Sequence, residues 1–185
     1  DAAGSVSAYN WESPALEALL SELVRQANIP LLERLLAVLL ERWPMLQARG
    51  ALPDADHTET RLLQTLRGHR WLAAASDGTL HHPNELWLPT SELLEVLVGS
   101  VPYVRAELPA QVATTLGVQT TLSPLRVVHL LADWADAAEH SAHVADPVDL
   151  TSMYIWLGAH ATTDEEVRKR LLGCRSIWVP RRFSS

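Results

Sequence analysis

The chain has 185 residues, of which 48% are hydrophobic and 20% are charged. This composition suits one large or two small folded domains and excludes an intrinsically disordered chain. The net charge of −7 and the pI of about 5.6 disfavour a dedicated nucleic-acid binder, which usually carries a basic field. No apolar run reaches the roughly 18 residues of a membrane span, so we predict no membrane association. Cys174 is the single cysteine, which favours a reducing, cytoplasmic compartment.

The first half of the chain predicts three helices. Ser13-Pro14 supplies an N-cap and a first-turn proline, and leucines at helical spacing follow until Asn28-Ile29-Pro30 interrupts them. A second helix is predicted from about residue 31 to residue 43, where Pro44 ends it. Its predicted buried stripe consists of leucines: Leu32, Leu35, Leu36, Leu39 and Leu40. The capping-box pattern of residues 56–59 predicts a third helix that ends at Gly68.

A β-hairpin is predicted after this helix. Residues 71–74 form an apolar, Trp-bearing run, which we interpret as the first strand. Asp77-Gly78 provides a turn, because glycine accepts a positive φ and aspartate tolerates one. We expect the return strand at residues 85–88.

The remaining elements are again mostly helical. Their patterns predict, in chain order, a helix at 92–98 capped by Ser91, a short strand at 101–105, a helix at 109–116 ended by Gly117, a long helix after Ser123-Pro124, another after Asp146-Pro147, one capped by Asp164, and a strand at 177–179. The predicted fold class is therefore mainly α with small β-hairpins, that is, α+β.

The order of these elements suggests an internal repeat. Ser13-Pro14 matches Ser123-Pro124, and each opens two helices, a shorter capped helix and a Trp-bearing strand. We predict a helix-helix-helix-hairpin unit repeated about one and a half times. In this division residues 1–12 are a linker or the start of the chain, residues 13–108 the first unit, and residues 109–185 a second unit that stops within its hairpin.

Patterns that would carry chemistry are weak in this sequence. His140 and His143 lack the further ligands that zinc needs, and Asp133, Asp136 and Glu139 lie on one helix face, where a solvated surface is the simpler interpretation. Neither a Walker-type loop nor a GxGxxG motif occurs. We therefore assign no catalytic, cofactor-binding or metal-binding residue, and expect no enzyme in this chain.

A helix followed by a hairpin also fits a winged-helix nucleic-acid binder. The residues that would contact nucleic acid are basic: Arg61, Arg67, Arg70 and His81. The leucines at positions 62, 63 and 66 occupy much of this helix, and the chain as a whole is acidic. This function is therefore kept as an alternative.

The hairpin carries the most distinctive residues: Trp71-Leu72, then Asp77-Gly78, then a run from His82-Pro83 through Glu85 to Trp87-Leu88. This pattern resembles the hairpin units of the long sacsin and NO VEIN proteins, downstream of a histidine-kinase or Hsp90-like ATPase domain. The resemblance covers roughly residues 13–180. It implies a large ATP-binding parent protein with chaperone-like or defence-related roles. The family's ATP-site motifs have no counterpart here, so no residue is carried over.

Our leading hypothesis is a non-catalytic scaffold that binds a protein partner or other domains of its own parent chain. The residues expected to contact the partner belong to the hairpin: Trp71, His82, Glu85 and Trp87. The nucleic-acid binder is one alternative. Another is a part of an enzyme whose active site is completed by other domains.

Overall fold

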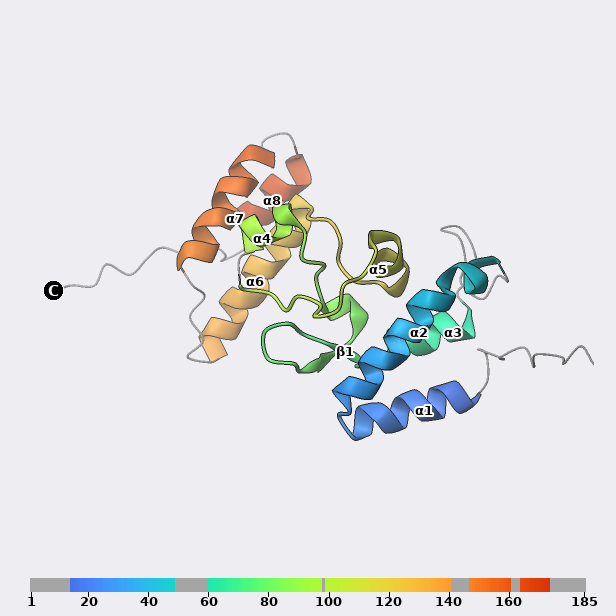
Figure 1. The fold of residues 1–185 in the computed structure, drawn as a ribbon. Helices are drawn as coiled ribbons and strands as arrows, with labels where there is room; N and C mark the ends of the chain where they lie inside the picture. Colours follow the sequence, from blue (N-terminus) through green and yellow to red (C-terminus); the bar gives the residue numbers. More distant parts are fainter. Residues whose placement is uncertain (1–13, 49–59, 98, 141–146, 161–163, 174–185) are drawn as a thin grey trace, which may run out of the picture. The chain divides into compact units, whose positions relative to one another are not determined.

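The fold is described from a computed structural model (Figure 1), which describes residues 14–48, 60–97, 99–140, 147–160 and 164–173. The side chains of residues 14, 136–140 and 147–149 are not described. The predicted capping box at 56–59, His143 and the predicted strand at 177–179 lie outside the described residues.

The described residues form α-helices, one short 3-10 helix and one hairpin, which confirms the predicted mainly helical α+β class. In chain order they are α1 (Pro14–Arg25), α2 (Ile29–Ala48), α3 (Arg61–Gly68), β1 (Leu72–Ala73), β2 (Leu80–His81), η1 (Pro83–Glu85), α4 (Ser91–Leu97), α5 (Ala110–Leu116), α6 (Pro124–His140), α7 (Pro147–His160) and α8 (Glu165–Gly173). None of these helices is long and apolar enough to cross a bilayer.

The chain divides into two compact units. Unit 1 comprises Asp1–Leu88 and Tyr103–Gln119, and unit 2 comprises Pro89–Pro102 and Thr120–Ser185. This division differs from the predicted boundary between residues 108 and 109, because residues 103–119 pair with the hairpin region of unit 1. The order of three helices in α1–α3 recurs in α6–α8. The repeat itself stays a prediction, since its second strand is outside the described residues.

Helices α1 and α2 form a tight antiparallel hairpin (Figure 1). The Ala27 N–H donates to the Val24 carbonyl and the Asn28 N–H to the Leu23 carbonyl, a Schellman arrangement with Ala27 at a positive φ of 49°. The Asn28 side chain then accepts from the Leu31 N–H at 3.3 Å and caps α2. Three residues therefore reverse the chain and bring α1 against α2.

The prediction that Pro44 ends the second helix is wrong, because α2 continues through it to Ala48. A proline in a helix interior removes one backbone hydrogen bond. The turn beyond Pro44 carries Leu46, which is fully buried in the core of unit 1. Burial of this leucine side chain offsets the lost hydrogen bond.

The hairpin has a different return strand from the predicted one. β1 pairs with β2 in an antiparallel register that places Leu72 opposite His81 and Ala73 opposite Leu80. Gly78 adopts a φ of 71° in the turn. After β2, His82 is the N-cap of η1, which begins at Pro83, a residue with no N–H to donate to a strand. The residues predicted as the return strand instead form η1 and a single bridging segment at Trp87.

The segment around Trp87 ties the hairpin to residues 103–119. The Val104 N–H donates to the Trp87 carbonyl, and the Leu88 N–H donates to the Gln119 carbonyl, both at 2.9 Å. Residues 101–105 therefore contribute isolated bridges rather than the predicted strand. Gly117 ends α5 in the left-handed region, with φ 90°, as its position predicted.

Unit 2 contains α4, α6, α7 and α8, with α7 packed against α4 and α6, and α8 packed against α6. Asp164 caps α8 as predicted, because its Oδ1 accepts from the N–H groups of Glu166 and Val167. Ser123 Oγ likewise accepts from the Arg126 N–H at the start of α6. The buried side chains of these helices are Leu93, Val96, Leu97, Val127, Val128, Leu131, Leu150, Met153, Leu157 and Val167.

Candidate functional site

Glu85 is the centre of a polar cluster on the hairpin. Its carboxylate lies 3.2 Å from the Arg70 guanidinium and 3.3 Å from Nδ1 of His81. It also accepts from the backbone N–H of His82 at 3.1 Å, which closes the first turn of η1. Arg70, His81, His82 and Glu85, predicted for two different functions, therefore form one cluster.

A second carboxylate joins the cluster through the turn. Asp77 Oδ1 accepts from both the backbone N–H and the hydroxyl of Thr79, at 2.9 and 2.8 Å. The Thr79 hydroxyl oxygen in turn lies 2.8 Å from Nε2 of His81. Asp77, Thr79, His81 and Glu85 thus form a continuous polar chain along the hairpin.

Both carboxylates of the cluster have lowered pKa values. For Asp77 the main causes are the hydrogen bonds from the N–H and hydroxyl of Thr79, which lower the pKa because they stabilise the ionised form. For Glu85 partial burial raises the pKa, but the hydrogen bond from His82 and the Arg70 guanidinium outweigh this effect and lower it overall. The cluster therefore contains two ionised carboxylates held by local donors, which stabilises the hairpin.

Changing Glu85 to glutamine is expected to lower the free energy of unfolding by about 1 kcal/mol or less at pH 7, because the ion pairs are partly exposed and screened. A lowered folded-state pKa contributes stability above the ordinary pKa of 4.5, and this contribution is lost as the pH falls through the folded pKa. The difference between wild type and Glu85→Gln should therefore shrink between pH 7 and pH 3.

Urea unfolding at several pH values measures this difference. Glu41→Gln is the matched control, because Glu41 is an exposed acid of unit 1. A difference for Glu85→Gln that is independent of pH would contradict the role assigned to its carboxylate.

The indole rings of Trp71 and Trp87 do not form a binding surface. Their exposed fractions are 1% and 2%, and Trp71 Nε1 donates to the Leu66 carbonyl at 2.7 Å inside the core. Side chains buried to this degree cannot contact a partner while unit 1 is folded. The expectation of direct contact is corrected accordingly: both tryptophans are core residues, whereas His82 and Glu85 lie in the partly exposed cluster.

The basic residues of the winged-helix alternative are engaged within the chain. Arg61 pairs with Glu17 of α1 at 3.3 Å, and Arg67 donates to the Thr115 carbonyl at 2.8 Å. Arg70 and His81 both contact Glu85. A nucleic-acid phosphate would have to compete with these partners, so no structural observation favours this alternative.

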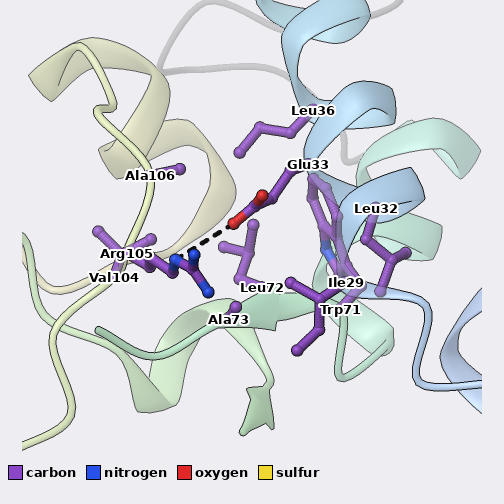
Figure 2. A pocket seen from close by; sticks show the side chains of 10 residues that line it. All are labelled: Ile29, Leu32, Glu33, Leu36, Trp71, Leu72, Ala73, Val104, Arg105 and Ala106. Carbon is purple, nitrogen blue, oxygen red and sulfur yellow. Dashed lines mark ion pairs between the residues drawn. The ribbon is translucent and has the colours of Figure 1, made fainter. Parts of the chain in front are cut away.

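One side of α2 faces a shallow hollow in unit 1 (Figure 2). Glu33 and Arg105 form an ion pair of 3.4 Å across it, and the side chains of Trp71 and Leu72 lie beside this pair. Its volume is about 10 Å³, which is about the space of one water molecule. This side of α2 is therefore covered by the chain's own residues 104–106 and by the ion pair.

A different side of α2 carries apolar residues toward solvent. Leu31 and Val38 are 42% and 46% exposed, Leu35 and Met45 are half-buried, and Arg42 is exposed. The spacing between successive residues of this set alternates between four and three positions, which places them in one line along a helix. We call them the outer seam: Leu31, Leu35, Val38, Arg42 and Met45.

The core-facing residues of α2 follow the same spacing one position later. They are Leu32, Leu36, Leu39, Trp43 and Leu46, all buried. Helix α2 therefore has two adjacent apolar lines. One is in the core, and in the other Leu31 and Val38 are exposed while Leu35 and Met45 pack against the core. The predicted buried stripe also included Leu35 and Leu40, which are partly buried and pack against the core. The sequence did not single out the exposed Leu31 and Val38 beside them.

No site with the ligands of a metal ion is found among the described side chains. Asp133 is exposed on α6, and the other residues of the acidic and histidine patterns lie outside the described side chains. No family model, curated protein or solved structure matches this chain. The resemblance to sacsin and NO VEIN proteins stays a prediction from the hairpin residues.

Proposed function

We propose that this chain is a non-catalytic protein-interaction region of a larger cytoplasmic protein, and that its unit 1 binds a partner helix along the outer seam of α2. The observation that carries the proposal is the exposure of Leu31 and Val38 beside the half-buried Leu35. Scattered exposed apolar residues are ordinary, but Leu31 and Val38 stand one heptad apart with Leu35 between them, which is the spacing that a second helix covers in a coiled coil.

Neighbouring parts of unit 1 support a fixed binding surface. The core line of α2 anchors the helix through five buried side chains. On the side of α2 opposite the seam, Glu33 forms an ion pair with Arg105. A helix that is fixed in this way presents its outer seam with little loss of conformational entropy on binding. The partner would be another protein or another domain of the same parent chain.

The resemblance to sacsin and NO VEIN proteins adds the wider context of the proposal. By that resemblance, the parent would be a large ATP-binding protein with chaperone-like or defence-related roles. The ATP site would belong to another domain, and the present chain would hold or move a partner. The nucleic-acid alternative has no supporting observation, since its basic residues have partners within the chain.

Val38→Glu is expected to abolish partner binding without unfolding the chain, because position 38 is solvent-accessible. The wild type and the variant would be immobilised and incubated with an extract of the cells that make the protein. The proteins that each of them retains would then be quantified by mass spectrometry. Ile155→Glu is the matched control, because Ile155 is a 70% exposed apolar residue on α7 of unit 2. Circular dichroism and thermal unfolding would show that both variants are folded.

The proposal predicts a specific protein that the wild type and Ile155→Glu retain and that Val38→Glu loses. If every retained protein binds equally to the wild type and to both variants, the binding is nonspecific, and this result would contradict the proposal. A retained protein that is lost equally from Val38→Glu and Ile155→Glu would also contradict the proposal, because its binding would not depend on the outer seam.

A further inference from the structure

The arginines of unit 1 that the structure describes fall into two groups. Five of them contact acceptors of the chain itself: Arg25 with Glu22, Arg61 with Glu17, Arg67 with the Thr115 carbonyl, Arg70 with Glu85, and Arg105 with Glu33. Arg34 and Arg42 are exposed and form no such contact within the described part of the chain. Among the described arginines of unit 1, the two without such an acceptor therefore both lie on α2.

Both of these arginines border the line of exposed leucine and valine. Arg42 is itself a member of the outer seam, and Arg34 directly precedes Leu35. They are eight residues apart, which corresponds to about 12 Å along a helix. The nearest acids on α2, Glu33 and Glu41, directly precede the two arginines, and none stands three or four positions away, so neither arginine has the usual ion-pair partner along its own helix.

A partner helix on the outer seam would cover Arg42 between Val38 and Met45. Burying a guanidinium without an opposite charge is costly, and a polar residue within an apolar seam selects the partner that satisfies it. Arginine pairs best with a carboxylate, which it binds with two parallel hydrogen bonds. We infer that the partner is an acidic amphipathic helix, with apolar residues at alternating spacings of three and four and carboxylates opposite Arg42 and Arg34.

This inference rests on the proposed function and specifies its partner. The chain has a net charge of −7, so acidic helices in general are repelled from it. A helix whose carboxylates meet the two arginines gains compensating ion pairs along the seam. The charge arrangement therefore favours a partner with carboxylates at these positions.

The test is a selection with displayed helical peptides of about five turns on the full chain. The peptides would have fixed apolar residues at seam spacing and randomised residues elsewhere. The binders would then be measured against Arg34→Glu, Arg42→Glu and Val38→Glu, with Arg168→Glu as the control. Arg168 is an exposed arginine of α8, so this control makes the same change in net charge away from the seam.

The inference predicts binders enriched in aspartate or glutamate at two positions about two turns apart. Arg42→Glu should weaken them about tenfold or more, and Arg168→Glu should weaken them much less. Exchanging the peptide carboxylate for lysine should restore binding to Arg42→Glu. This charge exchange separates a direct ion pair from a general effect of stability.

Three results would overturn the inference. Peptides that no longer bind to Val38→Glu but bind Arg34→Glu and Arg42→Glu as tightly as the wild type would refute the acidic partner. This result would leave the proposed function standing. A selection with no Val38-dependent binder would count against both. Dimerisation of the wild type that Val38→Glu abolishes, seen by analytical ultracentrifugation, would assign the seam to a second copy of the chain.

Discussion

Replacing Trp71 with alanine is expected to destabilise unit 1 by about 3–5 kcal/mol, as is typical of a large aromatic side chain removed from a core. The Trp71 indole is 1% exposed and lies beneath α2 beside Leu32 (Figure 2). The change also leaves the Leu66 carbonyl without the indole N–H that it accepts at 2.7 Å. Such a loss is comparable to the total stability of many domains of this size.

Urea unfolding followed by circular dichroism would measure the effect. Trp71→Phe is the matched variant, because it keeps most of the apolar volume and loses the hydrogen bond, and we expect it to cost less than alanine. Unchanged stability of Trp71→Ala together with lost partner binding would contradict the core assignment. It would restore the original expectation that this tryptophan is a contact residue.

Replacing Leu131 with alanine is expected to destabilise unit 2 by about 2–5 kcal/mol. Leu131 is fully buried on α6, the helix against which both α7 and α8 pack. Removing its side chain therefore leaves a cavity where several helices meet, and the cost depends on how far they can close it.

Ile155→Ala is the control for this prediction, because Ile155 is also apolar but 70% exposed on α7. Its removal should change the free energy of unfolding by less than about 0.5 kcal/mol. Hydrogen exchange would assign the loss in Leu131→Ala to α6, α7 and α8. Equal effects of the two substitutions would show that α6 does not organise this unit.

Local signals in the sequence predicted most helix boundaries. Gly117 and Asp164 end and begin helices through hydrogen bonds among neighbouring residues, so their patterns are sufficient. Pro44 misled the prediction, because the burial of Leu46 beyond it is a tertiary effect. The return strand was misplaced because the turn at Gly78 fixes the register, which puts β2 directly after the turn.

The site was less predictable than the fold. Tryptophans beside apolar residues suggested a distinctive surface, yet both are buried, and Trp71 lies beside residues of α2. The Glu85 cluster joins residues up to fifteen positions apart, which no short motif reveals. The outer seam was hidden among many leucines, because the side of α2 that is covered depends on tertiary packing, including that of α1, β1 and residues 104–106.

The most direct measurement of the central claim is cross-linking from within α2. A photoreactive amino acid would be placed at position 38 or at position 37 in the full-length protein in its own cells, and the cross-linked peptides would be sequenced. Ala37 is exposed on the same helix but outside the outer seam, so it is a matched control. We predict that position 38 cross-links to one acidic amphipathic segment and that position 37 does not. Equal cross-linking from both positions, or cross-links from position 38 to unrelated segments only, would contradict the assignment of the outer seam as the binding surface.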